Sequence, residues 1–129
     1  MRLLLDTHAL IWWVLGNPLL SARASNAIAN AASDVLVSSA SAWEISIKHR
    51  IGKLPPEAHV LADNVAASIE AEGFIELPIG IAHGQMAGAL DGHHKDPFDR
   101  MLIAQALAED LTLVSNDMQF DAYGVKRLW

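Results

Sequence analysis

The sequence of 129 residues contains no cysteine, and only 6% of its residues are aromatic. The absence of cysteine excludes disulfide bonds and every zinc site that depends on thiolate ligands. It is compatible with a reducing compartment, and we expect a cytoplasmic protein. Positive charge is also scarce, because 9 Lys and Arg stand against 15 Asp and Glu and the formal net charge is −6. Nucleic-acid-binding proteins are usually basic, so this balance counts against one unless bound cations offset the acids locally.

Long hydrophobic runs are missing as well. No apolar stretch approaches the roughly 20 residues of a membrane span, so no membrane association is expected. The stretch MRLLLDTHALIWWVLG resembles a signal peptide only superficially, because Asp6 and His8 interrupt it and no small-residue cleavage site follows Leu15. The hydrophobic fraction is nevertheless 52%. We therefore expect a single domain over residues 1–129 whose sheet is covered on both faces, or whose surface is covered in part by a partner.

Short apolar runs alternate with helical patterns along the chain. Strands are predicted at 2–5, 35–39, 74–78, 111–115 and, as an edge strand, 125–129. Helices are predicted at 8–15, 21–32, within 39–54, at 57–72, at 81–90 and from 97 to about 109. The alternation predicts an α/β fold with a parallel sheet between two layers of helices.

The stretch HHKDPFDRMLIAQALAEDLTLVSND, residues 93–117, joins a helix to a buried strand. Asp96 and Pro97 are a helix-start signal, with an acceptor at the N-cap and proline at the first helical position. Asp99 then falls in the first helical turn. The strand LTLVS ends at Asn116-Asp117, which is a turn signal.

Acidic residues occur at the ends of the predicted elements. Asp6 ends the first strand, Asp117 follows the LTLVS strand, and Glu44 lies in the first turn of the helix after the second strand. Parallel strands bring their carboxyl ends to one edge of a sheet, so we expect these acids to share that edge. The position of Asp99 is left open, because its helix leads into the LTLVS strand.

Each acid also has a purely structural explanation. Asp6 and Asp99 can stabilise helix starts, whereas Glu44 can complete a capping box with Ser41 or pair with Lys48. As a set, the acids are harder to explain in this way, because clustered like charges cost stability unless a cation lies between them. Carboxylates without cysteine suit Mg²⁺ or Mn²⁺, which activate water and stabilise displacement at phosphorus.

Four motifs in this order and spacing, DTHALIWW, SSASAWEISIKHRIGKL, HHKDPFDRMLIAQAL and LTLVSND, resemble the PIN-domain family. The resemblance is closest to the VapC-type ribonuclease toxins of type II toxin–antitoxin systems and covers essentially the whole chain. It implies a three-layer sandwich with a short parallel sheet of four to five strands flanked by helices. It also implies that the catalytic and metal-binding acids are Asp6, Glu44, Asp99 and Asp117, with the start of the Asp99 helix at the pocket.

The activity implied by the resemblance is cleavage of RNA phosphodiesters by metal-activated water, with Mg²⁺ or Mn²⁺ as cofactor. Thr7, Asp96 and Ser115 are expected to orient carboxylates or water around the site. The implied partners are the RNA substrate, a second copy of the chain, and an antitoxin that inserts a segment into the acidic pocket. An arginine of that segment would fit the charge of the pocket.

Basic and histidine residues near the motifs are further candidates. Arg100, Lys48 and Lys95, followed by Arg50 and Lys53, are the candidates for RNA phosphate contacts, with a solvated surface as the alternative. The pair His93 and His94 resembles a metal pair, but adjacent side chains rarely converge on one ion, so we expect loop or substrate contacts. His8 is expected to be packed or solvated rather than a ligand.

The apolar residues leave room for an interface. Most of the four tryptophans, Trp12, Trp13, Trp43 and Trp129, are expected to pack inside. The helix 9–15 and the stripe of Leu61, Val65 and Ile69 could serve an interface.

Three other functions remain open at this point. A DNA nuclease or a phosphatase could use the same metal site, because nothing in the motifs reads a 2′-hydroxyl; matched RNA and DNA assays distinguish them. A receiver-like module would need paired acids after the first strand, where this chain has DTH. A non-catalytic nucleic-acid-binding module with a structural metal would keep its function when Asp6 is replaced by alanine.

Overall fold

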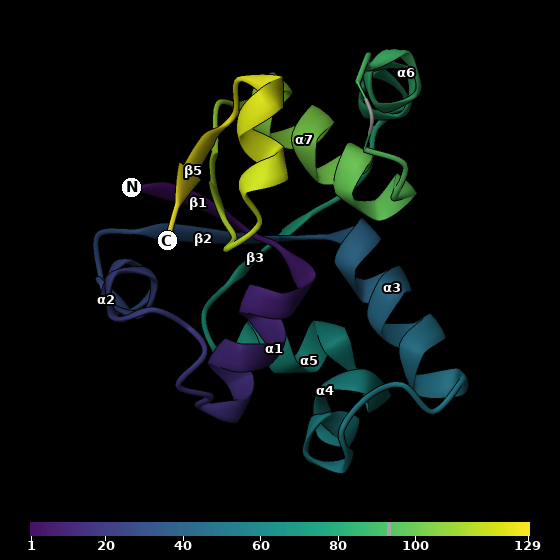
Figure 1. The fold of residues 1–129 in the computed structure, drawn as a ribbon. Coiled ribbons are helices and arrows are strands. Elements are labelled where there is room, and N and C mark those ends of the chain that lie inside the picture. The colour runs from purple at the N-terminus through teal and green to yellow at the C-terminus, as the bar shows by residue number, and fades with distance from the viewer. Residues whose placement is uncertain (93) are drawn as a thin grey trace.

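A computed structural model describes residues 1–92 and 94–129. In this part of the chain, a five-stranded parallel sheet has the strand order β3-β2-β1-β4-β5 and lies between layers of helices (Figure 1). The strands are β1 (Arg2–Leu5), β2 (Asp34–Ser38), β3 (Ile75–Leu77), β4 (Thr112–Val114) and β5 (Lys126–Leu128). The predicted three-layer α/β sandwich is confirmed, and β5 is an edge strand as expected.

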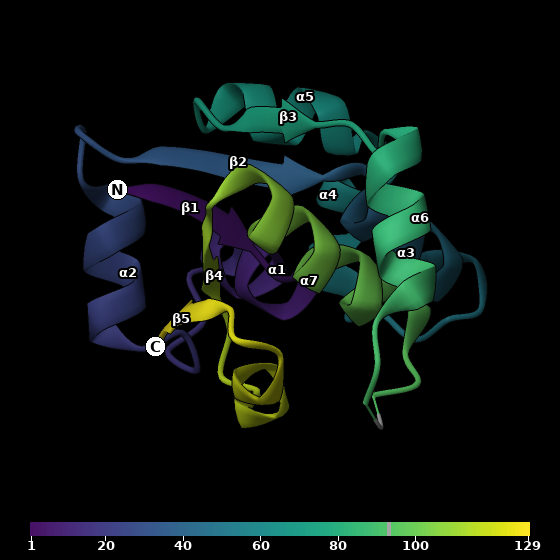
Figure 2. The same ribbon diagram turned by 90° about the horizontal axis from the view of Figure 1, so that it is seen from above.

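Helices connect the strands in the alternation that the sequence predicts. They are α1 (Thr7–Leu15), α2 (Ala22–Ala29), α3 (Ser39–Arg50), α4 (His59–Asp63), α5 (Val65–Ala71), α6 (Ile81–Ala89) and α7 (Pro97–Glu109), with short 3₁₀ helices η1 (Pro56–Ala58) and η2 (Met118–Tyr123). Figure 2 shows the strands side by side, with α7 crossing one face of the sheet. None of the described helices is long and apolar enough to cross a bilayer.

Alternation along β1 divides the core between the two faces of the sheet. Leu3 and Leu5 are fully buried in one cluster, which α1, α2, α4 and α5 cover, and Leu4 is fully buried in the other, which α7 and η2 cover. A central strand of a parallel sheet is buried on both faces, and after the exposed Arg2 every residue of β1 is a buried leucine. The first polar residue after Leu5 is Asp6, which lies where the strand leaves the sheet.

The strand register brings three strand ends to one edge. Leu5 pairs with Val37 of β2 and with Val114 of β4, and the backbone N–H of Asp6 donates to Val114 O at 3.1 Å. The residues that follow β1, β2 and β4 therefore emerge next to one another.

The helix predicted at 57–72 is wrong in its continuity. Asn64 has φ −154° and ψ 87°, and it separates α4 from α5. Its side chain accepts a hydrogen bond from Ala67 N at 3.0 Å and caps α5. Asparagine side chains compete for backbone hydrogen bonds in this way. The periodicity of apolar residues alone does not indicate such a break in a helix.

The capping box predicted for Ser41 and Glu44 is also wrong. Ser38 is the N-cap of α3, and its hydroxyl accepts a hydrogen bond from Ala40 N at 3.0 Å. The helix begins directly after β2, so Ser41 and Glu44 lie inside it and are buried. Trp43 lies on the same helix but is exposed, with an exposed fraction of 62%.

The apolar residues expected at an interface are distributed differently. Leu61 and Ile69 are buried in the core, so their stripe is not available as an interface. Trp12, Trp13 and Trp129 pack against the same core but stay half-buried. The expectation that most tryptophans pack inside therefore holds for these three, whereas Trp43 is exposed.

Candidate functional site

A cavity of about 550 Å³ opens at the edge where β1 and β4 end. All the acids predicted for the site contribute to its wall. The lining residues are Asp6, Thr7, His8, Glu44, Lys48, Asp96, Asp99, Asn116, Asp117, Gln119 and Phe120.

The question left open for Asp99 is answered by the direction of α7. The end of α7 leads into the start of β4, and the first turn of α7 lies with Asp117, beyond the end of β4. The helix that precedes a parallel strand runs antiparallel to it, so it begins at the edge where the strands end. The position of Asp99, which the strand pattern left open, is therefore at the same edge as the other acids.

Asp6 both caps a helix and lines the cavity. Its carboxylate accepts a hydrogen bond from Ala9 N at 2.7 Å and caps α1, as the structural explanation predicts. The side chain is also buried and faces the cavity. Burial raises the pKa of the Asp6 carboxyl, and Glu44 adds to this, although hydrogen bonds from Ser115 and Ala9 oppose the shift.

Glu44 is held by two side chains, those of Thr7 and Lys48. The hydroxyl of Thr7 donates to Glu44 Oε1 at 2.6 Å and lies 3.2 Å from Ser41 Oγ. Lys48 Nζ lies 2.9 Å from Glu44 Oε2, so the pairing expected one helical turn later is present. Thr7 thus touches a carboxylate of the cavity, and Ser41 is a supporting residue that the capping-box interpretation concealed.

Asp99 is the acid most perturbed by its surroundings. Burial, followed by the charges of Asp96, Glu44, Asp6 and Asp117, raises the pKa of the Asp99 carboxyl from 3.8 to about 7. Asp96 is the N-cap of α7, where its side chain accepts from Phe98 N at 2.9 Å and Asp99 N at 3.2 Å. Asp96 therefore fixes the turn that carries Asp99.

Asp117 is the most accessible of the four acids predicted to bind metal, with 35% of its side chain exposed. It caps η2 by accepting from Gln119 N at 2.9 Å, and its own N–H donates to Ser115 Oγ at 3.0 Å. Ser115 is fully buried and also hydrogen-bonds the Asp6 side chain. One hydroxyl therefore links the turn of Asp117 to the carboxylate of Asp6.

His94 is the residue that sequence reasoning undervalued. Its Nε2 lies 3.0 Å from Asp99 Oδ2 and 3.9 Å from Asp117 Oδ2, so it faces acids of the site rather than only loop. The sequence feature that could have indicated this role is its position in a histidine pair, which Lys95 separates from the DPFDR motif. His93, the other member of the pair, lies outside the described residues.

The basic residues predicted to contact phosphate have different surroundings. Lys48 lines the cavity, whereas Lys95, Arg50 and Lys53 are exposed outside its wall. Arg100 is engaged by the backbone, because its guanidinium donates to the carbonyls of three residues that precede it: Ala87, Leu90 and His94. These bonds use its donors for the loop between α6 and α7.

The donor set fits a divalent cation. Among the described residues that line the cavity, Lys48 is the one permanent positive charge beside five carboxyl groups. Burial first, and then the charges of neighbouring acids, raise the pKa of both Asp6 and Asp99, so a bound cation would stabilise their ionised forms. Clustered oxygen donors of this kind suit hard cations such as Mg²⁺ and Mn²⁺.

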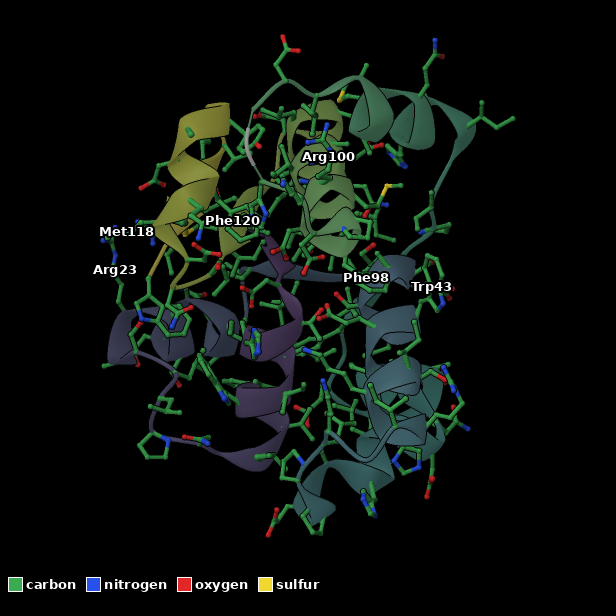
Figure 3. All side chains as sticks on the ribbon, turned by 45° about the vertical axis from the view of Figure 1, so that its right-hand side comes forward. Arg23, Trp43, Phe98, Arg100, Met118 and Phe120 are labelled. Atoms are coloured by element: carbon green, nitrogen blue, oxygen red, sulfur yellow. The ribbon has the colours of Figure 1, made fainter. Side chains whose placement is uncertain are left out.

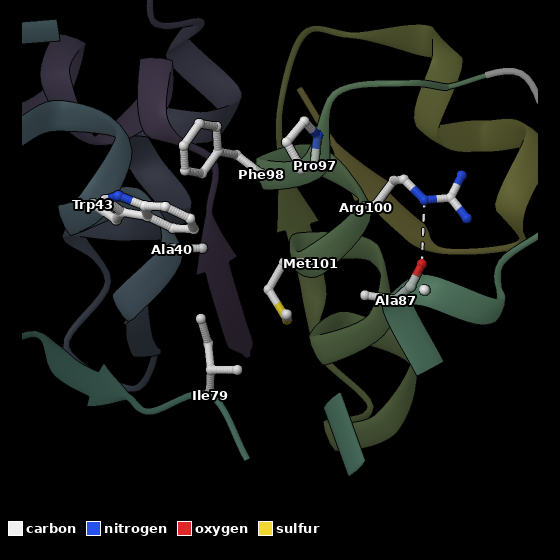
Figure 4. A pocket seen from close by; sticks show the side chains of 9 residues that line it. Ala40, Trp43, Ile79, Ala87, Pro97, Phe98, Arg100 and Met101 are labelled. Atoms are coloured by element: carbon white, nitrogen blue, oxygen red, sulfur yellow. Dashed lines mark hydrogen bonds between the residues drawn. The ribbon is translucent and has the colours of Figure 1, made fainter. Parts of the chain in front are cut away.

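An apolar groove lies beside the acidic cavity. It has a volume of about 240 Å³ and includes Trp43 and Phe98, whose rings meet edge to face at 5.1 Å (Figure 4). Trp43 precedes Glu44 on α3, and Phe98 precedes Asp99 on α7. The two helices therefore supply acids to the cavity and aromatic rings to the groove.

The chain is similar to known proteins in sequence and in fold. A family model described as PIN domain matches residues 3–126. No curated protein matches the sequence. Among solved structures, VapBC2 from Rickettsia felis bound to a promoter DNA fragment is similar with a TM-score of 0.70 at 16% identity, covering 99% of this chain and 98% of that one.

Two further structures show the same fold. FitAcB from Neisseria gonorrhoeae has a TM-score of 0.68 at 20% identity and covers 98% of this chain and 96% of its own. VapC20 from Mycobacterium tuberculosis, described as a sarcin-ricin loop cleaving toxin, has a TM-score of 0.62 at 17% identity, with 95% of each chain covered.

Proposed function

This chain belongs to the PIN-domain family, and on that premise we propose that it is one PIN domain over residues 1–129, acting as a divalent-metal-dependent endoribonuclease of the VapC toxin type. The observation that carries the proposal is the convergence of Asp6, Glu44, Asp99 and Asp117 in one cavity. VapC20 has the same fold and is described as a sarcin-ricin loop cleaving toxin. This similarity supports RNA as the substrate of the present chain.

The four acids would hold Mg²⁺ or Mn²⁺. When bound, the cation supplies positive charge to the scissile phosphate and lowers the pKa of water near it. Binding also requires ionised carboxylates, so Asp99, with its pKa of about 7 in the metal-free protein, releases its proton when the cation binds.

The surrounding residues hold the acids in place before substrate arrives. Thr7 fixes one oxygen of Glu44, and the Ala9 N–H fixes one oxygen of Asp6. Preorganised donors and acceptors need no rearrangement during the reaction, which is the main source of electrostatic catalysis. Lys48 is placed to contact a substrate phosphate at the rim of the cavity.

The test is cleavage of total RNA by the purified chain in Mg²⁺, Mn²⁺ or EDTA, beside Asp6→Asn and the control Asp110→Asn. Asp110 is exposed and pairs with Lys126, away from the cavity. We expect cleavage that requires the metal, is lost in Asp6→Asn and is kept in Asp110→Asn, with 5′-phosphate and 3′-hydroxyl ends. Cleavage in EDTA, or 2′,3′-cyclic phosphate ends, would overturn the mechanism.

A matched single-stranded DNA of the same sequence tests the nature of the substrate. Equal cleavage of DNA and RNA would replace the assignment with a DNA nuclease on the same site. Cleavage of a phosphomonoester in preference to both would replace it with a phosphatase. Metal binding and RNA binding without cleavage of any of these substrates would indicate a non-catalytic module.

The apolar groove supports a homodimer as part of the proposal. Trp43 is 62% exposed and Ile79 is 39% exposed, and both line the groove with Met101. Water-exposed apolar side chains gathered in one place mark interaction surfaces. A second copy bound there would extend the wall of the acidic cavity, because α3 and α7 form part of both.

The cavity also supports an antitoxin as partner. A basic segment, with an arginine that reaches the carboxylates, would match the local charge and exclude substrate. Because such a toxin acts on cellular RNA, we place the protein in the cytoplasm. Co-purification with the product of an adjacent reading frame, and inhibition of cleavage by that product, tests this partner.

A further inference from the structure

His94 is held over the acidic cavity by contacts on several sides. Its backbone N–H donates to Tyr123 Oη at 3.1 Å, and its carbonyl accepts from Arg100 Nη1 at 3.0 Å. The ring of Phe120 lies against the imidazole, with 5.6 Å between the ring centroids. Figure 3 shows Phe120 on η2 and Arg100 on α7, the elements on either side of this loop.

A turn at Gly92 completes this arrangement. Gly92 has φ +111°, and a Cβ atom there would lie 2.6 Å from Tyr123 Oη. Only glycine allows both this backbone conformation and this approach of the tyrosine hydroxyl. The conformation that presents His94 to the cavity is therefore built into the loop and its neighbours.

The imidazole has a buried nitrogen without a hydrogen-bond partner. Only 10% of the His94 side chain is exposed, and Nε2 is buried without a hydrogen bond in the described part of the protein. Asp99 Oδ2 lies 3.0 Å from Nε2 as an ion-pair contact and not as a hydrogen bond. A buried polar atom left in this way is costly unless it binds something else.

Ligand atoms of three residues converge at this point. One atom each from His94, Asp99 and Asp117 lies within 4.8 Å of the other two. We propose that His94 is a metal ligand of this site, so that the cation of the proposed nuclease is held by a nitrogen donor together with carboxylate oxygens. This inference rests on the proposed function, since it assigns a further ligand to the same cation.

A nitrogen donor changes which cation the site prefers. Mg²⁺ takes oxygen ligands almost exclusively, whereas imidazole favours the transition metals. The mixed donor set therefore selects Mn²⁺, and still more Co²⁺, over Mg²⁺. A site built only from the four acids would discriminate less between these ions.

The test is binding of Mn²⁺ and Mg²⁺ to the purified chain, measured by titration calorimetry and by pulsed electron paramagnetic resonance of bound Mn²⁺. We expect a nitrogen coupling in the resonance spectrum of the wild type and its loss in His94→Ala. Mn²⁺ affinity should fall by about tenfold or more in this variant, a loss typical of altered metal shells. Mg²⁺ affinity should change by less than about threefold, because oxygen ligands dominate its binding.

Two further variants make the result specific. His94→Gln keeps polar bulk in the loop if His94→Ala unfolds, and it should lose the nitrogen coupling equally. His8→Ala removes a histidine from the wall of the acidic cavity without touching the group of His94, Asp99 and Asp117, and it should keep the coupling.

Different results would overturn the role of His94 and the proposed function. Tight Mn²⁺ binding without nitrogen coupling, or coupling that disappears only in His8→Ala, would overturn the role of His94 and leave the acidic metal site standing. No binding of either cation by the wild type would overturn the metal site itself and, with it, the proposed metal-dependent nuclease.

Discussion

The hydroxyl of Thr7 donates a hydrogen bond of 2.6 Å to Glu44 Oε1 and so ties the start of α1 to the middle of α3. Both residues are buried, at 3% and 8% exposed. Replacing Thr7 with valine keeps the shape of the side chain but removes the donor. We expect the rate of RNA cleavage to fall by about 10- to 100-fold, the usual effect of losing a group that orients a metal ligand.

Thr7→Ser is the matched control for this change. It keeps a hydroxyl at the same position and should retain most of the activity that Thr7→Val loses. A Thr7→Val enzyme that cleaves RNA at the wild-type rate would show that Glu44 does not need this bond.

The raised pKa of Asp99 predicts how stability depends on pH in the metal-free protein. The pKa rises from 3.8 when unfolded to about 7 when folded, so the native state keeps a proton that the unfolded state has released. The free energy of unfolding should therefore fall as the pH rises between these values, with a slope of up to about 1.4 kcal/mol per pH unit from this group.

Chemical denaturation in EDTA at several pH values measures this slope. Asp99→Asn should flatten it, because the amide does not titrate. Asp110 and Asp121 do not confuse the result, because ion pairs lower their pKa values and they titrate below this window. An unchanged slope in Asp99→Asn would show that other groups are responsible.

Lys48 is predicted to contact a phosphate of bound RNA. Lys48→Met should raise KM more than it lowers kcat, and it should reduce the salt dependence of RNA binding by about one counterion. Lys126→Met removes a lysine that pairs with Asp110 outside the cavity and serves as the control. Equal salt dependence in the wild type and Lys48→Met would assign Lys48 only to the support of Glu44.

Trp43 tests the proposed homodimer. Trp43→Glu places a charge in the apolar groove, and we expect the chain to become monomeric in analytical ultracentrifugation. The free energy of unfolding of the isolated chain should change by less than about 0.5 kcal/mol, because the side chain is mostly exposed. Val60→Glu, at a position 79% exposed on α4, should leave the oligomeric state unchanged.

Arg100 is predicted to stabilise the fold rather than to bind RNA. Its guanidinium donates to the carbonyls of Ala87, Leu90 and His94, so Arg100→Met leaves these acceptors without donors. Because these part-buried bonds are each worth about 0.5 to 1.5 kcal/mol, we expect a loss of about 2 to 3 kcal/mol in the free energy of unfolding, measured by urea denaturation. Arg23→Met, at an exposed position on α2, should cost little.

Much of the fold could be predicted because the local signals agree with one another. The runs of apolar residues located every strand, and the acceptor and proline at Asp96-Pro97 located the start of α7. Periodicity failed at Asn64, where one side chain that caps α5 outweighed a continuous apolar stripe. It also misplaced the start of α3, because Ser38 serves both β2 and the helix cap.

The cavity was predicted less completely than the fold. Strand ends indicate Asp6 and Asp117 because position along a parallel strand fixes the edge that a residue reaches. His94 could not be placed in the same way, since its orientation depends on Tyr123, Arg100 and Phe120, which come later in the chain. The surroundings of Arg100 could not be predicted either, because its hydrogen bonds to Ala87, Leu90 and His94 depend on how the loop before α7 folds back.

The strand order also has a consequence for synthesis on the ribosome. The central strand β1 is made first, but one of its two neighbours, β4, follows more than a hundred residues later, when residues 112–114 pair with residues 3–5. Asp117 follows β4 directly. A growing chain that stops short of this point lacks both a completed sheet and one wall of the cavity. The cavity is therefore assembled only when nearly all of the elements of the chain have been translated.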